Sequence, residues 1–168
     1  IDSRETAPAA ATRDMYLGAD GKPRSGADSS TVGWRASGVP GTVAGLALAV
    51  EKYGSGKVTW AQVCEPARRL AAQGHVVTAA TAAELRQHAA LLGQFPESKR
   101  VYLKGGAFLA AGETWVQDDL ARTLGRLQEY GPREFYEGET ALRLAEGMAR
   151  NGGTISAEDL RLYAPVER

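Results

Sequence analysis

The sequence is poor in the residues that build most redox, metal and nucleophilic sites. It contains one cysteine and two histidines among its 168 residues. A single cysteine cannot form an internal disulfide, and Cys64 falls in a helical pattern, where a small buried apolar residue is expected rather than a reactive thiol. His75 and His88 have no cysteine partner and no clustered carboxylates, so neither resembles a metal ligand. We expect no cofactor and no metal.

The sequence also lacks net charge and long apolar runs. Twenty basic residues balance twenty acidic ones, whereas proteins that bind nucleic acid carry a basic surface. No stretch approaches the roughly 18 apolar residues of a membrane-spanning helix, and no signal peptide is recognisable. We expect no nucleic-acid partner and no membrane span.

The length of the chain suits one domain, which would bury roughly two thirds of its unfolded surface. It begins at Ile1 within a segment typical of a strand and stops at Arg168 without a tail. We therefore expect residues 1–168 to be a single partial domain, incomplete at both ends. Residues 18–37 are rich in glycine, serine and aspartate, which predicts a flexible loop with a tight turn at Asp20-Gly21.

Amphipathic periodicity covers most of the chain and predicts a mainly α fold. Pro40 is expected at the first position of one helix, Thr59 and Gln62 cap a second with a kink or break at Pro66, and Thr81 begins a third. Further helices are expected over residues 118–130, 139–150 and 156–163. The residues expected on buried helix faces are Val43, Leu46, Ala47, Val50, Val63, Ala67, Leu70, Ala71, Leu85, Ala89, Leu92, Leu120, Leu124, Leu127, Leu142, Ala145 and Met148.

The period changes between residues 98 and 115. Val101 and Leu103, then Gly105-Gly106, then Phe108 and Leu109 predict two short strands around a glycine turn. The predicted fold class is therefore mainly α with a few short strands.

Two sequence features resemble known catalytic or binding motifs but do not match them. Gly38, Gly41 and Gly45 precede or begin a helix, yet they fit neither a dinucleotide fingerprint nor a P-loop. Close packing of a helix start against neighbouring backbone is the expected use of these glycines. Asp118 and Asp119 are adjacent, so they point to different sides of a helix and make a poor acid–base pair.

Arg4 is the candidate binding residue. It lies in an extended segment, Ile1 to Ala7, which Pro8 closes. Its planar guanidinium can bind a carboxylate through two parallel hydrogen bonds. The alternative for Arg4 is a solvated surface pair with Glu5 or Asp2.

Several motifs together resemble the large-subunit half of γ-glutamyltranspeptidases, in the right order and over nearly the whole chain. They are Arg-Glu-Thr-Ala-Pro at 4–8, Asp-Met-Tyr at 14–16, Gly-Val-Pro-Gly-Thr-Val-Ala-Gly at 38–45, Pro-Ala-Arg-Arg-Leu-Ala at 66–71, Gln-Asp-Asp-Leu-Ala-Arg-Thr-Leu at 117–124, Gly131 through Phe135-Tyr136, Gly138, Gly152-Gly153 and Glu-Asp-Leu at 158–160.

The resemblance implies one helical lobe of an N-terminal-nucleophile hydrolase with an αββα core, made as a precursor that cleaves itself into two subunits. The nucleophilic threonine of the small subunit is implied to lie beyond Arg168. Arg4 matches the family's arginine that clamps the α-carboxylate of the γ-glutamyl donor, such as glutathione. The small subunit is the implied partner, and the parent enzyme is implied to be periplasmic or secreted. The chain alone is expected to be inactive and, through open strand edges, to self-associate.

Two other hypotheses remain: a non-catalytic helical interaction module, and a fragment of a related cephalosporin acylase-type amidohydrolase, which shares the architecture. A self-contained hydrolase is not expected, because no nucleophile and base come together and no G-x-S-x-G elbow is present.

Overall fold

The computed structural model describes residues 1–168 and forms two compact units. The first combines residues 1–63 with residues 126–168, and the second is the continuous segment 64–125. The expectation from the sequence, that residues 1–168 are a single partial domain, remains a prediction.

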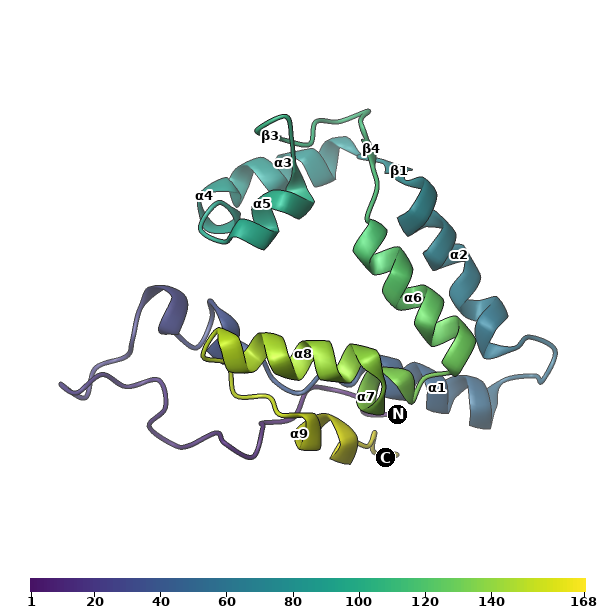
Figure 1. Cartoon of the computed structure of the whole chain (residues 1–168), viewed down its shortest axis with the longest axis horizontal. Coiled ribbons are helices and arrows are strands. Elements are labelled where there is room, and N and C mark those ends of the chain that lie inside the picture. The colour runs from purple at the N-terminus through teal and green to yellow at the C-terminus, as the bar shows by residue number, and fades with distance from the viewer. The chain divides into compact units, whose positions relative to one another are not determined.

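Helices dominate the structure, as predicted, and the strands are few and short (Figure 1). The helices are α1 Thr42–Tyr53, α2 Trp60–Gln73, α3 Ala79–Gln87, α4 Ala89–Leu92, α5 Pro96–Tyr102, α6 Asp118–Tyr130, α7 Glu134–Glu137, α8 Glu139–Arg150 and α9 Ala157–Leu162. The strands are β1 His75–Val76, β2 Leu103–Lys104, β3 Ala107–Phe108 and β4 Thr114–Trp115, and two 3-10 turns span Gly26–Asp28 and Trp34–Ala36. No helix combines the length and the apolar character needed to span a membrane.

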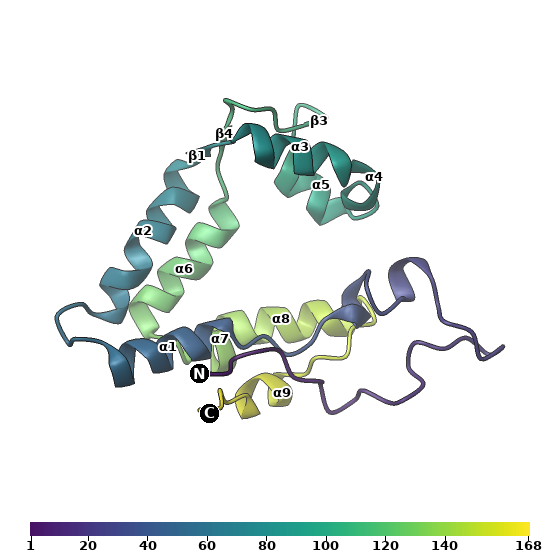
Figure 2. The same ribbon diagram turned by 180° about the vertical axis from the view of Figure 1, so that it is seen from behind.

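The core of the first unit joins its two chain segments. Helices α7, α8 and α9 contact one another, and α8 lies beside α9 in both views (Figure 1 and Figure 2). Val39 from the N-terminal segment packs with buried residues of the C-terminal one. Those residues are Tyr136, Ala141, Met148, Ile155, Leu160 and Tyr163.

The second unit has its own small core of Val77, Ala82, Leu85 and Leu109. Strands β1 and β4 pair antiparallel, and β2 and β3 form the predicted hairpin. Both turn glycines of that hairpin have positive φ angles, as a tight two-residue turn requires.

Several predicted helix ends are confirmed. The Thr59 hydroxyl accepts a hydrogen bond from the Gln62 N–H, and the Gln62 side chain accepts one from the Thr59 N–H. Ser156 caps α9, and Gly131 with a φ of 82° follows the end of α6.

Other helix boundaries differ from the predictions. Gly41, not Pro40, immediately precedes α1, because the Gly38–Pro40 backbone is drawn into contact with the N-terminal segment. The N-cap of α3 is Thr78, whose hydroxyl accepts a hydrogen bond from the Thr81 N–H, so Thr81 lies inside the first turn. Helix α2 continues through Pro66, so of the predicted kink or break, the break does not occur. Val101 belongs to α5, not to a strand.

Several residues predicted on buried helix faces are exposed. Leu46 and Leu142 are each 58 % exposed, although Leu127 and Met148 are buried as predicted. Val63, Leu70 and Leu120 are exposed as well, and so is Ala67. The amphipathic period is present in each of these helices, but neither unit has an element that covers the whole apolar face.

Residues 18–37 contain no α-helix and no strand of a sheet. The predicted turn is present: Gly21 has a φ of 74°, and the Gly18 N–H donates to the Lys22 carbonyl oxygen at 2.8 Å. The ring of Trp34 lies against Gly147 of α8. The flexibility of this loop remains a prediction.

Candidate functional site

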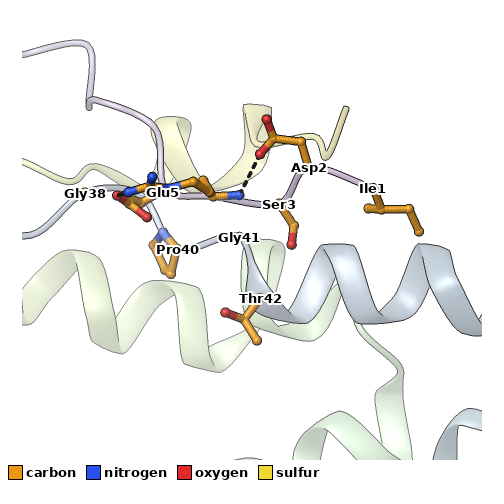
Figure 3. Close-up of a pocket in the computed structure, with 9 residues that line it drawn as sticks. Ile1, Asp2, Ser3, Glu5, Gly38, Pro40, Gly41 and Thr42 are labelled. Carbon is orange, nitrogen blue, oxygen red and sulfur yellow. Dashed lines mark hydrogen bonds and ion pairs between the residues drawn. The ribbon is translucent and has the colours of Figure 1, made fainter. Parts of the chain in front are cut away.

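An open hollow of about 690 Å³ lies between the N-terminal segment and the chain that leads into α1 (Figure 3). Arg4, the residue singled out from the sequence, is one of its lining residues. The complete lining consists of Ile1, Asp2, Ser3, Arg4, Glu5, Gly38, Pro40, Gly41 and Thr42.

Backbone hydrogen bonds hold the two walls of this hollow together. The Thr6 N–H donates to the Val39 carbonyl oxygen at 3.2 Å, and the Val39 N–H donates to the Thr6 carbonyl oxygen at 2.8 Å. Asp2 and Val166 form a second isolated bridge of this kind. Residues 1–7 are therefore extended, as predicted, but they form single bridges rather than a strand of a sheet.

Glycine allows the walls to approach closely. A Cβ added at Gly41 would overlap both the Ser3 carbonyl oxygen and the Tyr163 hydroxyl, and one added at Gly45 would overlap the Ser3 side chain. One added at Gly38 would lie 3.0 Å from the Glu5 side chain. The prediction that these glycines serve close packing at a helix start is confirmed.

Two buried tyrosines hold the walls in place through hydrogen bonds of their hydroxyl groups. The Tyr163 hydroxyl donates to the Arg4 carbonyl oxygen at 2.8 Å. The Tyr136 hydroxyl donates to the Pro40 carbonyl oxygen at 3.0 Å and accepts from the Ala44 N–H at 3.1 Å. Burial raises the pKa of both phenols, so each remains protonated and able to donate at neutral pH.

The Arg4 side chain is 82 % exposed and pairs with Glu5, with 3.0 Å between Nη2 and Oε1. The hydrogen bond to Glu5 raises the pKa of Arg4. A backbone hydrogen bond within Glu5 itself and the Arg4 guanidinium together lower the pKa of the Glu5 carboxyl. The surface pair considered in the sequence is thus present, and its exposure leaves the guanidinium open to competition from a ligand carboxylate.

The chemistry of the lining favours recognition over reaction. It contains one guanidinium, the carboxylates of Asp2 and Glu5, and the hydroxyls of Ser3 and Thr42, but no histidine, lysine or cysteine. A hydroxyl without an adjacent base is a weak nucleophile. Arg4 is the one cationic side chain of the lining, so its guanidinium is the group there that an anion would contact.

The other candidate residues that the sequence raised lie in the second unit and do not line the hollow, namely Cys64, His75, His88, Asp118 and Asp119. Asp119 bonds to Arg100 and Arg122, and Arg100 is the main cause of the lowered pKa of Asp119. Cys64 is buried, as predicted, and burial raises the pKa of its thiol. The His75 ring packs against Trp115 in a tilted arrangement, with 5.6 Å between ring centroids and 47° between ring planes.

Sequence reasoning missed Tyr136 and Tyr163. Tyr136 belongs to one of the motifs that carry the family resemblance, but nothing there indicates its role. For both residues, the signal in the sequence that concerns their role is that a buried tyrosine needs a partner for its hydroxyl. The partners lie 96 and 159 residues away along the chain, beyond the reach of any local pattern.

The model of the Gamma-glutamyltranspeptidase family matches residues 1–168. The chain is 44 % identical to the glutathione hydrolase proenzyme of Escherichia coli strain K12, over 100 % of this chain and 28 % of that relative. It therefore spans little more than a quarter of the length of that relative.

Solved structures agree with this match. The γ-glutamyltranspeptidase of Helicobacter pylori superposes with a TM-score of 0.91 at 36 % identity, covering 96 % of this chain and 46 % of that one. A cephalosporin acylase from Bacillus halodurans superposes with a TM-score of 0.80 at 23 % identity, covering 98 % of this chain and 31 % of that one, which shows a shared fold alone. With a family model that matches every residue, the chain belongs to the γ-glutamyltranspeptidase family.

Proposed function

We propose that this chain is part of the large subunit of a γ-glutamyltransferase or glutathione hydrolase, and that Arg4 binds the α-carboxylate of the γ-glutamyl donor. One observation carries the proposal: Arg4 stands exposed in a hollow whose walls are fixed by glycine contacts and tyrosine hydrogen bonds. A backbone held in place with a guanidinium open to solvent lets a ligand carboxylate approach and form two parallel hydrogen bonds.

The chemistry is proposed to come from outside residues 1–168. The family resemblance assigns the nucleophile to an N-terminal threonine of a small subunit, released by self-cleavage of a precursor with an αββα core. That subunit is the proposed partner, glutathione is a representative donor, and the parent enzyme is proposed to be periplasmic or secreted.

The two alternatives have less support. A fragment of a cephalosporin acylase would explain the fold, but identity to that structure is 23 %, against 44 % to the glutathione hydrolase. A non-catalytic interaction module would not need an arginine kept exposed in the hollow.

The test is substitution of Arg4 in the complete enzyme that contains this chain, followed by γ-glutamyl anilide kinetics. Because hydrogen bonds to a charged group are strong, Arg4→Ala should raise KM by about 10- to 150-fold. Lysine keeps the charge but not the planar fork, so Arg4→Lys should give a smaller loss. Part of each loss should appear in kcat, since a loosely held donor misplaces its acyl carbon. Self-cleavage should persist.

The matched control is Arg13→Ala, which removes an arginine that is 96 % exposed and lies outside the hollow lining. It should leave KM unchanged, and the isolated 168-residue chain should give no turnover above a blank. An Arg4→Ala enzyme that matures normally and keeps the wild-type KM would show that Arg4 is a surface residue that does not bind the donor. Turnover by the isolated chain would equally contradict the proposal.

A further inference from the structure

The backbone of Arg4 is held by a residue from the far end of the chain. The Arg4 carbonyl oxygen accepts a hydrogen bond of 2.8 Å from the Tyr163 hydroxyl. Tyr163 is buried, and its hydroxyl also lies against Gly41, where an added Cβ would come within 1.9 Å of it. The hydroxyl therefore sits at the point where the two walls of the hollow meet.

Tyr163 is itself fixed by a second tyrosine. Its ring stacks on Tyr136 with 5.7 Å between centroids and 12° between planes. The Tyr136 hydroxyl bonds to Pro40 and Ala44 in the opposite wall. The stacked pair thus connects the Arg4 segment to the start of α1.

The hydrogen bond from Tyr163 to the Arg4 backbone matters because no rigid contact holds the Arg4 side chain. The Arg4 guanidinium has one exposed partner, Glu5, which a ligand carboxylate must displace. When the Cα of a long side chain is fixed, fewer positions are open to its end group. Less conformational entropy is then lost when that group binds a ligand.

We infer that Tyr163 is a positioning residue for Arg4, whose hydroxyl fixes the backbone from which the guanidinium reaches the donor carboxylate. This inference rests on the proposed function of Arg4. It assigns to the tyrosine an effect on donor affinity that acts only through the arginine.

The experiment uses the complete enzyme and γ-glutamyl anilide kinetics. Tyr163→Phe keeps the ring and its stack but removes the hydroxyl, and should raise KM by about two- to tenfold, the range expected for one neutral hydrogen bond. The change in kcat should be smaller. Tyr130→Phe, which alters an exposed tyrosine outside the hollow, should leave KM unchanged.

A double-mutant cycle separates positioning from general destabilisation. If Tyr163 acts through Arg4, Tyr163→Phe should add no further loss in an Arg4→Ala background. Gly41→Ala tests the same contact from the other wall, because its methyl group has to displace the Tyr163 hydroxyl or Ser3. It should also raise KM, and again only when Arg4 is present.

Each outcome is decisive. An unchanged KM for Tyr163→Phe or for Gly41→Ala, or losses that add to that of Arg4→Ala, would overturn the positioning role while leaving the proposed function of Arg4 intact. An Arg4→Ala enzyme with unchanged KM would overturn the proposed function, and this inference with it.

Discussion

Among individual residues, Glu134 is a carboxylate enclosed in the first unit, with 4 % of its side chain exposed. Its Oε1 atom accepts from Arg126 Nε at 3.1 Å and from the N–H and hydroxyl of Thr140 at 2.9 and 3.0 Å. The bonds link the C-terminal part of α6 to the first turn of α8. Glu134 therefore connects three helices through one oxygen atom.

Removing this carboxylate should destabilise the protein strongly. Glu134→Ala takes from the largely buried Arg126 a partner that balances its charge, a change that typically costs about 3–5 kcal/mol. Urea unfolding followed by circular dichroism measures it. The control is Glu137→Ala in the same short helix, which breaks an exposed pair with Arg133 and should cost at most about 1 kcal/mol. Equal losses for the two variants would show that Glu134 acts as a surface residue.

The residues of the hollow differ in how well the sequence predicts them. The sequence singled out Arg4, which lines the hollow, because its extended segment and its guanidinium are local features. The close-packing role of Gly38, Gly41 and Gly45 was found because they match no phosphate-binding motif. Tyr163 was not found, since its importance comes from a contact made 159 residues away.

At the level of elements, two helices begin with the same reciprocal cap but with different chemistry. Helix α2 uses Thr59 with the neutral Gln62, and α9 uses Ser156 with the ionisable Asp159. Burial alone would raise the pKa of Asp159, but hydrogen bonds from Ser156 and from the Ala9 N–H outweigh it and lower that pKa. The cap of α9 should therefore depend on pH, and the cap of α2 should not.

The direction of this pH dependence follows from the linkage between protonation and folding stability. A carboxyl with a lowered pKa in the folded state contributes stability that is present above its ordinary pKa of about 3.9 and is lost as pH falls through the folded value. Asp159→Asn should thus reduce the free energy of unfolding most near pH 7, with the difference from wild type shrinking below about pH 4. Gln62→Ala, the control, should cost about the same at every pH. A constant difference for Asp159→Asn would contradict the prediction.

Caps and turns were largely predictable because they depend on neighbours three or four residues apart. Helix α5 was not, because its seven residues carry too little periodicity and Val101 matched a strand pattern. The exposure of Leu46 in α1 and of Leu142 in α8 was mispredicted for a different reason. The sequence shows that each helix has an apolar face, but what covers it depends on elements that a local pattern does not describe.

For the whole molecule, the exposed leucines of α1 and α8 predict self-association. The sequence led to the same expectation on a different ground, open strand edges, and it remains a prediction. Leu46 and Leu142 are more than half exposed in the first unit, and burying them against a second copy removes apolar surface from water. The isolated chain should therefore show a light-scattering mass above its 17.8 kDa monomer. Replacing both leucines with glutamine should lower that mass, whereas Arg150→Gln, an exposed polar change on α8, should not. A monodisperse monomer at high concentration would contradict the prediction.

The first unit is built from two separate segments of the chain, and this also fixes the order in which the two units can fold during synthesis. The second unit is one continuous segment whose core residues lie between Val77 and Leu109, so all its partners leave the ribosome close together. Arg4 and Val39 must wait until Tyr163 has been translated, which takes roughly 8–30 s at common elongation rates. Throughout that interval the segment that carries Arg4 lacks its anchor. Within residues 1–168, the hollow is therefore among the last features to form, although its arginine lies near the start of this segment.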